Sequence, residues 1–435
     1  MKRVLSVALT LLILTAVTTA LPAVGAGVGA AASAAAATRL EVVWMGWPKD
    51  LLDEQLAPFL QANPDIELDI QAVPFNQLFQ TLEVRLASSQ PPDVFIVDGP
   101  LTASYAHRGY LMPLDSLIYE EELAEFFPAS VEACKYRGVL YALPYTSSAA
   151  GLYFNIDIFN EYGVELPPQK PGDRITWEHV LELARRLTVD SNGDGQPEVW
   201  GLLIEQSDRP YQLLPLAESL GARPLSPDGS TSEGFVNSEA FIKAARFYGD
   251  LFNAEKVSPV GILDAPVVRE YFGSGKAAMM LGAEWNISRL AEFEGFNFGL
   301  SAHPAFEGGR AVTPTGGWHV GISSRIPSDK LDAALHFARY MTSREASAAW
   351  ARLFGNAPAR RDAYEALPDL FSNYMWEVLL YDMEHTASPR PVTPAYLEFE
   401  ARLKDAFNAI QFGADPTEAL NEAARLIDRE LARYR

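Results

Sequence analysis

One segment of the sequence carries oxygen donors at alternate positions, as a calcium-binding loop does. Residues 190–198 read Asp-Ser-Asn-Gly-Asp-Gly-Gln-Pro-Glu. Side-chain oxygens at positions 1, 3 and 5, with a glycine at position 6 for the sharp turn, can converge on one hard cation. The candidate metal ligands are Asp190, Asn192, Asp194, the carbonyl of Gln196, and Glu198.

The same loop departs from the full calcium pattern at position 12. Gly201 stands there in place of the bidentate glutamate that would close the site. Either a carboxylate from elsewhere completes the coordination or the segment is an ordinary turn. No reactive group stands nearby, so we expect a bound calcium ion to be structural, and the sequence requires no cofactor.

A second group of residues is aromatic and stands beside glycines or at the ends of predicted strands. Such rings can pack on the flat C–H faces of a sugar, while its hydroxyls need carboxylate, amide or guanidinium partners. Glycine neighbours let the backbone approach a ligand closely. A tryptophan taken alone is more often a core residue, and Trp177, Trp200, Trp350 and Trp376 are assigned to the core. The candidate ligand-binding residues are Trp44, Trp47, Asp98, Tyr145, Glu284, Trp285, Trp318 and Arg360.

Motifs of catalysis do not accompany these residues. The sequence has no Gly-x-Ser-x-Gly elbow, no Gly-x-x-x-x-Gly-Lys phosphate loop and no His-x-x-x-His metal pair. Its six histidines are scattered, and any pair chosen from 56 Asp and Glu residues for glycoside hydrolysis would be arbitrary. We name no catalytic residue and expect a binding protein, with a secreted carbohydrate-active enzyme as the alternative.

Strands and helices alternate where the chain must position these side chains. Apolar runs at 40–45, 66–73 and 92–97 predict strands, and the apolar spacing of 50–62 and 76–88 predicts helices. This alternation predicts a parallel sheet with helices on both faces. Because ligands bind outside the carboxyl ends of such strands, residues 44–47 and 98–99 are expected beside one cleft.

The rest of the chain continues this α/β style and then becomes chiefly helical. Some 395 residues are too many for one ordinary core, so we expect two lobes. No low-complexity linker separates them, which suggests that the chain crosses between the lobes more than once. Further strands are predicted at 138–145, 151–155 and 277–281, and further helices at 176–187, 239–253, 329–341, 343–353, 369–383 and from 394 to the end.

The first residues and the charge define the compartment and exclude one class of partner. A basic start, an apolar stretch at 4–17 and small residues up to 37 predict a secretory signal peptide over residues 1–37. Cys134 is the single cysteine, so no intramolecular disulfide forms, and no lipid-attachment cysteine stands near the expected cleavage region. The net charge of −21 repels phosphate backbones, so nucleic acid is not an expected partner.

Several motifs, in this order and spacing, resemble the extracellular solute-binding proteins of ABC transporters, in the sugar-binding group that includes maltose-binding proteins. The resemblance covers essentially the whole chain after the signal segment. Its marks are Asn63-Pro-Asp-Ile66, Pro92-Asp-Val-Phe95, Gly109-Tyr-Leu-Met-Pro-Leu-Asp115, Gly138-Val-Leu-Tyr-Ala-Leu-Pro144, Leu152-Tyr-Phe-Asn155, Gly273-Ser-Gly-Lys-Ala-Ala-Met279 before Trp285, Gly316-Gly-Trp318, and Gly355-Asn-Ala-Pro-Ala-Arg360.

The resemblance implies an α/β periplasmic-binding-protein fold whose two lobes close on a ligand in the cleft between them. It places an N-terminal lobe at 38–146 plus 302–340 and a C-terminal lobe at 147–301 plus 341–435. Crossings are implied near 145–149, 298–304 and 340–343. It also places Gly317 at the cleft, together with the aromatic and charged candidates above.

The resemblance further implies an exported, periplasmic or extracytoplasmic component of an ABC importer. Its partners would be a small-molecule sugar and a membrane permease, and the protein is expected to be a monomer. Ser147-Ser148 and Val97-Asp98 replace, respectively, an acidic and an aromatic residue of maltose-binding proteins, which leaves the sugar open. The alternative within binding proteins is a non-sugar ligand such as glycerol phosphate. A phosphate would need cations in the cleft, and Arg360 is the one that the motifs indicate.

Overall fold

The computed structural model describes residues 37–205, 207–261 and 264–434, so the expected signal segment lies outside the described residues except for Ala37. Within them, the first lobe is built on a five-stranded sheet in the order β2-β1-β3-β12-β6. Strands β1, β2 and β3 are parallel to one another, while β12 is antiparallel to β3 and β6. The bounds are β1 Thr38–Met45, β2 Ile66–Val73, β3 Val94–Asp98, β6 Ala142–Pro144 and β12 Trp318–Ile322.

The second lobe is built on a four-stranded sheet in the order β10-β7-β9-β8, counted over the same described residues. Every residue of β7 and β9 is buried, as is every residue of β3 in the first sheet, which means that both faces of each sheet are covered. The bounds are β7 Ala150–Asn155, β8 Trp200–Ile204, β9 Ala277–Ala283 and β10 Phe298–Ala302; two small ladders pair β4 (Lys135–Tyr136) with β5 (Val139–Leu140) and β11 (Thr313–Pro314) with β13 (Ala387–Ser388).

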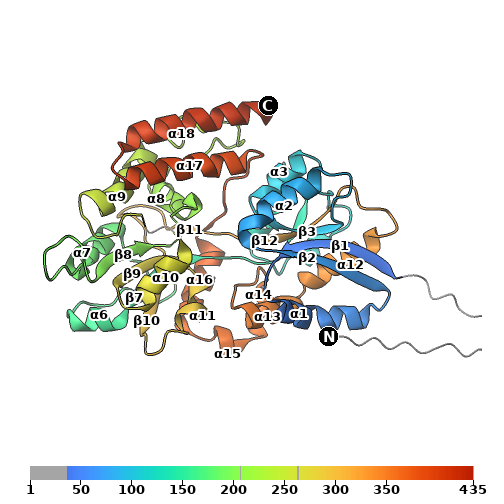
Figure 1. Cartoon of the computed structure of the whole chain (residues 1–435), viewed down its shortest axis with the longest axis horizontal. Coiled ribbons are helices and arrows are strands. Elements are labelled where there is room, and N and C mark those ends of the chain that lie inside the picture. Colours follow the sequence, from blue (N-terminus) through green and yellow to red (C-terminus); the bar gives the residue numbers. More distant parts are fainter. Residues whose placement is uncertain (1–36, 206, 262–263, 435) are drawn as a thin grey trace, which may run out of the picture. The chain divides into compact units, whose positions relative to one another are not determined.

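Helices cover the two sheets (Figure 1). In the first lobe, α2 packs on β1 and β2, and α12 packs on β1 and β12. In the second lobe, α7 packs on β8 and β9, α10 on β9, α16 on β10, and α8, α9, α17 and α18 pack on one another. The bounds are α1 Lys49–Ala62, α2 Phe75–Ala87, α3 Leu101–His107, α4 Glu120–Leu123, α5 Pro128–Ala133, α6 Ile156–Glu161, α7 Trp177–Leu187, α8 Leu214–Ser219, α9 Glu239–Asn253, α10 Ala265–Gly273, α11 Asn286–Leu290, α12 Leu331–Met341, α13 Arg344–Phe354, α14 Arg361–Glu365, α15 Pro368–Phe371, α16 Tyr374–His385, α17 Tyr396–Gln411 and α18 Pro416–Leu431.

Two of the expected C-terminal helices are each divided in two, and side-chain caps explain where. The predicted helix 369–383 is α15 followed by α16, because the Asn373 side chain accepts hydrogen bonds from Met375 N and Trp376 N and starts a new helix. The helix predicted from 394 onward is α17 followed by α18, because Gly413 has a positive φ of 95° and Asp415 caps the next helix.

The chain passes between the lobes near two of the three expected places. It leaves β6 and enters β7 through residues 145–149, and it returns from β10 to β12 through residues 303–317. The expected third crossing at 340–343 is wrong. Helix α13 contacts α1 and α12, and Trp350 meets Trp47 at a ring-centroid distance of 4.3 Å, so α13 still packs with the first sheet.

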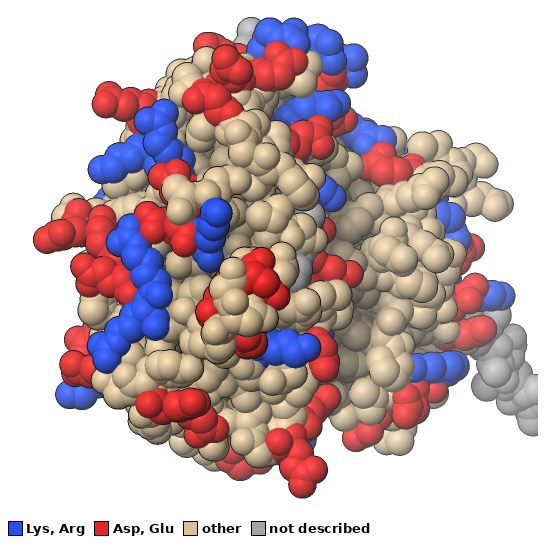
Figure 2. All heavy atoms as spheres, turned by 60° about the vertical axis from the view of Figure 1, so that its left-hand side comes forward, with Lys and Arg blue, Asp and Glu red and all other residues tan. Residues whose placement is uncertain are grey.

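On the face drawn in Figure 2, basic and acidic side chains are interspersed. Among the described residues, no helix is long and apolar enough to span a membrane. The mixture of charges on this face gives no continuous basic surface for the phosphate backbone of a nucleic acid.

A close approach between helix α7 and strand β8 explains why position 12 of the calcium-like loop is glycine. Gly201 begins the buried part of β8, directly beneath α7. A Cβ atom at this position would stand 2.1 Å from the Ala184 carbonyl oxygen and 2.6 Å from its carbonyl carbon. The helix and the strand can touch only because residue 201 has no side chain.

We predict that Gly201→Ala destabilises the protein by about 3 kcal/mol, because a backbone clash with α7 forces the helix away from the sheet. Urea unfolding measures the change. Ser191→Ala, an exposed position of the neighbouring loop, is the control and should change stability by less than about 0.5 kcal/mol. Equal stability of Gly201→Ala and the control would contradict the packing described above.

Candidate ligand-binding site

A cavity of about 350 Å³ lies between the two lobes, at the carboxyl ends of β1, β3, β8 and β9. This is the position that the rule for open α/β sheets requires. Its size is in the range of small-molecule sites. The residues that line it are Met45, Gly46, Trp47, Phe75, Asp98, Thr146, Ser147, Ser148, Arg209, Tyr211, Ala265, Pro266, Arg269, Glu284, Trp285, Arg289, Gly316, Gly317, Trp318, Asn356 and Arg390.

The wall from the first lobe is aromatic. Trp47 is half-buried, and its ring is held edge-on by Trp350. Trp318 opens β12, is half-buried, and stacks on Phe79 with an interplanar angle of 24°. Phe75 completes this wall with its ring edge toward Trp318. Both tryptophans therefore present ring surface to the cavity in orientations that their neighbours fix.

The wall from the second lobe is organised by Glu205, which directly follows β8 and is fully buried. Its carboxylate accepts hydrogen bonds from Trp285 Nε1 at 3.1 Å and from Asn286 Nδ2 at 2.7 Å. The same carboxylate pairs with Arg269 Nη1 at 3.7 Å. Burial raises the pKa of Glu205, and the hydrogen bonds offset only part of this effect. Glu205 thus sets the position of a ring and of a cation that both face the cavity.

The floor of the cavity is a buried ion-pair network that joins the lobes. Asp98, at the end of β3, accepts from Arg390 Nη1 at 3.1 Å and from Arg209 Nη2 at 2.9 Å, and also contacts Arg390 Nη2. Arg209 reaches Glu400 on α17 at 3.2 Å. Burial by itself would raise the pKa of Asp98, but the two guanidinium groups outweigh it and lower the pKa below its ordinary value.

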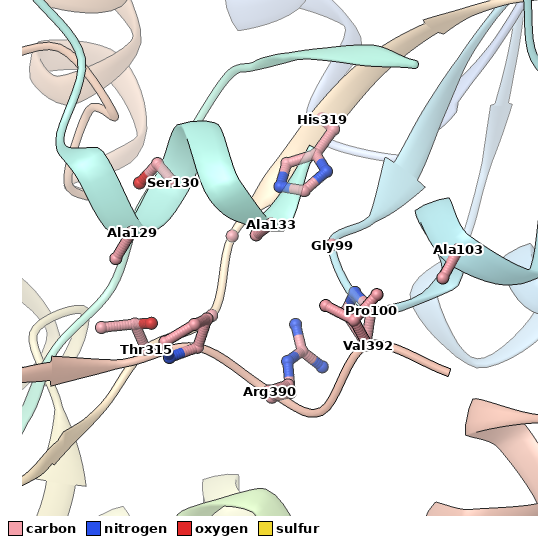
Figure 3. Close-up of a pocket in the computed structure, with 13 residues that line it drawn as sticks. Gly99, Pro100, Ala103, Ala129, Ser130, Ala133, Thr315, His319, Arg390 and Val392 are labelled. Carbon is pink, nitrogen blue, oxygen red and sulfur yellow. The ribbon is translucent and has the colours of Figure 1, made fainter. Parts of the chain in front are cut away.

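A second, much smaller cavity lies behind this floor (Figure 3). Arg390 points into it between the β3–α3 turn at Gly99 and Pro100, helix α5, and His319 on β12. Its volume of about 20 Å³ has room for a water molecule but not for a sugar. Of these two cavities, only the interlobe cavity has room for a sugar. The small cavity shares Arg390, Gly316 and Gly317 with it.

Glu284 is the carboxyl group of the cavity that has no ion pair among the described residues. It is buried, and its Oε2 accepts a hydrogen bond from Ala149 N at 3.3 Å. Burial is the main cause that raises the pKa of Glu284 to about 8. At neutral pH this side chain is therefore mostly protonated, and its hydroxyl can donate a hydrogen bond to a ligand.

Six of the nine residues named from the sequence line the cavity: Trp47, Asp98, Glu284, Trp285, Gly317 and Trp318. The other three were expected at the cleft but do not line this cavity. Trp44 and Tyr145 are fully buried, and their rings pack against each other at 5.3 Å because the last residues of β1 and the segment after β6 meet inside the core. Arg360 is held away by Asp362 at 2.7 Å and by the ring of Phe126.

Sequence reasoning missed all four arginines that line the cavity. Arg209 and the positioning residue Glu205 follow the apolar run 200–204, so the rule that selected Asp98 and Glu284 could have found them. Arg269 and Arg289 lie in short helices, and Arg390 and Asn356 lie in irregular segments. Asn356 lies in a motif quoted above, but no local pattern marks the three arginines, because only the packing of distant segments brings them to one cavity.

The calcium-like loop lies in the second lobe, between α7 and β8. Asp190 accepts from Gly193 N at 2.8 Å and from Gly195 N at 2.9 Å, and Asp194 accepts from Gln196 N at 2.8 Å. Over the part of the chain that the structure describes, three or more His, Cys, Asp or Glu side chains nowhere gather as metal ligands. Asn192 and the Gln196 carbonyl belong to other donor types, so calcium binding stays a prediction.

Fold and cavity together define a two-lobed binding protein of the periplasmic type. The family model "Bacterial extracellular solute-binding protein" matches residues 45–348. The chain therefore belongs to this family of exported solute-binding proteins.

Related proteins agree with this assignment. A putative binding protein of Brucella abortus is 22% identical over 383 residues, covering 86% of this chain and 88% of that protein. The mannitol-binding protein of Pseudomonas aeruginosa is 25% identical over 306 residues, covering 66% of this chain and 64% of its own.

Solved structures share the fold. An ABC transporter solute-binding protein of Thermotoga lettingae, bound with α-D-tagatose, matches with a TM-score of 0.77 and 22% identity over 91% of this chain and 100% of its own. An ABC substrate-binding protein of Listeria monocytogenes in complex with cycloalternan matches with a TM-score of 0.77 and 22% identity over 91% of this chain and 99% of its own.

The raised pKa of Glu284 predicts that stability falls between about pH 4.5 and pH 8. In this window the unfolded chain ionises Glu284 while the folded protein keeps it protonated, so the contribution is complete below the ordinary pKa of 4.5 and is lost as the pH rises through 8. Glu284→Gln should remove this dependence and gain up to roughly 4 kcal/mol over wild type on going from pH 4.5 to pH 8.

Urea unfolding from pH 4.5 to pH 8 measures this effect. Glu294→Gln, at an exposed position, is the control and should run parallel to wild type. A Glu284→Gln curve that also runs parallel to wild type would show that Glu284 ionises normally in the folded protein.

Proposed function

We propose that this protein is the substrate-binding component of an ABC importer and that it captures a carbohydrate in the cavity between its lobes. The observation that carries the proposal is the interlobe cavity with three half-buried tryptophans, Trp47, Trp285 and Trp318, among hydrogen-bonding groups. Indole faces suit the C–H faces of sugar rings, and buried polar groups suit the hydroxyls. Several relatives and structural neighbours are described with sugars or a sugar alcohol, which supports the same ligand class.

Capture needs no chemistry. A ligand that contacts both walls binds more tightly when the lobes are closed, so it shifts the population toward the closed form. The closed form then offers one surface to a membrane permease. We also propose that the protein acts as a monomer and without catalysis; product formation from oligosaccharides would favour the alternative of a secreted carbohydrate-active enzyme.

A phosphate-bearing ligand is the second candidate. The structure offers it more cations than the single arginine expected from the sequence. Arg360 does not reach the cavity, but Arg209, Arg269, Arg289 and Arg390 do. Moreover, an sn-glycerol-3-phosphate-binding protein of Rhizobium meliloti is 22% identical over 307 residues, 66% of this chain and 67% of that protein.

We predict that Trp318→Ala and Trp285→Ala each weaken sugar binding at least tenfold, about 1.4 kcal/mol, because each removes a ring from a cavity wall. A thermal-shift panel of tagatose, maltose, maltotriose, cycloalternan and mannitol selects the probe, and calorimetry then measures its Kd. Phe412→Ala removes an exposed ring outside the cavity, with 64% of its surface accessible, and should leave Kd within twofold. Wild-type affinity in both tryptophan variants would refute the proposed cleft.

We further propose that the loop 190–198 binds a structural calcium ion. Its hydrogen bonds to Gly193, Gly195 and Gln196 already turn it sharply, and a carboxylate oxygen that accepts one hydrogen bond keeps a lone pair for a cation. Without a glutamate at position 201, affinity should fall in the weak range of extracellular sites, on the order of 0.1–1 mM.

We predict that 5 mM calcium raises the melting temperature of wild type over an EDTA-treated sample, because binding to the folded state adds stability by mass action. Asp194→Asn should abolish this rise. Asp228→Asn, in another exposed loop that hydrogen-bonds its own serines, should retain it. The absence of both a thermal shift and a calorimetric signal in wild type at 5 mM calcium would disprove the site.

A further inference from the structure

The charges of the cavity fall into two groups that differ in whether they are neutralised. Arg209 and Arg390 share the buried carboxylate of Asp98, and Arg209 also pairs with Glu400. These two cations are therefore matched by two anions in the floor. Arg269 and Arg289 belong to the wall of the second lobe, on α10 and α11.

The second pair lacks a matching set of anions. Glu205 pairs with Arg269 at 3.7 Å, but its oxygens also accept from Trp285 and Asn286. Arg289 lines the cavity and makes no hydrogen bond or ion pair with any residue that the structure describes. The nearby carboxyl group of Glu284 is protonated at neutral pH because burial raises its pKa to about 8.

The two guanidinium groups also repel each other. Burial, followed by the charge of Arg269, lowers the pKa of Arg289, and the carboxyl groups of Glu205, Glu284 and Glu292 offset this only in part. The guanidinium still keeps its proton at neutral pH. A cation that is partly desolvated, repelled by a neighbour and not paired is stabilised by any anion that enters. Among the described residues, the opposite wall offers the rings of Trp47 and Trp318 and no acidic group other than the paired Asp98.

We propose that the ligand is a sugar or polyol that carries an anionic group, a carboxylate or a phosphate, which Arg289 binds with the help of Arg269. This inference rests on the proposed function and specifies the class of its ligand. The uncharged ring packs on the tryptophans of the first lobe, while the acidic group faces the second lobe. A carboxylate or phosphate can accept two parallel N–H bonds from Arg289, and such charge-assisted pairs are among the stronger hydrogen bonds.

Matched ligand pairs test the inference by calorimetry at pH 7. The probes are D-galactose with D-galacturonate, α-1,4-galactotriose with trigalacturonate, D-glucose with D-glucose 6-phosphate, and glycerol with sn-glycerol 3-phosphate. We expect at least one acidic member to bind ten times more tightly than its neutral partner, and the pairs distinguish carboxylate from phosphate. Arg289→Gln should reduce that ratio to near one, whereas Arg289→Lys keeps part of it.

Arg425→Gln, on the exposed surface of α18, is the control for charge alone and should preserve the ratio. A neutral member that binds as tightly as its acidic partner overturns the inference and leaves the proposed function standing. An unchanged ratio in Arg289→Gln also overturns it. Failure of every acidic and neutral probe, together with the sugar panel above, overturns both the inference and the proposed function.

Discussion

The buried carboxylate of Asp98 is the point on which the cleft depends. It lies at the end of β3 in the first lobe, and its partners Arg209 and Arg390 come from segments that follow β8 and β13. A carboxylate so deeply buried would be costly without partners, and so would each guanidinium. The three groups therefore hold one another in place and close the floor of the cavity between the lobes.

These ion pairs separate the groups of the cavity that are bound within the protein from those that are free to contact a ligand. Asp98 and Glu400 neutralise the arginines of the floor, so those two cations already have partners within the protein. Glu205 does the equivalent work in the second lobe, where it holds the indole N–H of Trp285. The groups left to contact the proposed ligand are the half-buried tryptophans and Arg289, which makes no ion pair among the described residues.

The structure explains the hydroxyl residues that stand at the first crossing, where maltose-binding proteins have an acidic residue. Ser148 Oγ accepts from Gly316 N at 2.7 Å, and Thr146 Oγ1 accepts from Trp318 N at 3.0 Å. Neutral hydroxyls at the first crossing thus tie it to the segment that presents Trp318. An acidic residue at this position would have added another carboxyl group to the lining of the cavity that already holds Asp98.

Much of the fold follows from local sequence. Strand–helix alternation and proline stops gave the parallel β2-β1-β3 core with nearly correct bounds, and the rule for strand ends located Asp98 and Glu284. Local patterns failed where the environment is made by distant segments. Trp44 and Trp47 are three residues apart and equally aromatic, yet Trp44 is buried against Tyr145 while Trp47 faces the cavity.

The sequence by itself therefore determined the layers and the edge of the first sheet at which the cavity lies, because these depend on periodicity along the chain, while its motifs carried the resemblance to the family. Only the tertiary structure decided which charges face the ligand. Arg360 pairs with Asp362, two residues away in the sequence, whereas Arg390 pairs with Asp98, which is 292 residues away. Arg289 on α11 and Arg269 on α10 both line the cavity and repel each other. A side chain's charge is readable from its type, but its partners are set by long-range packing.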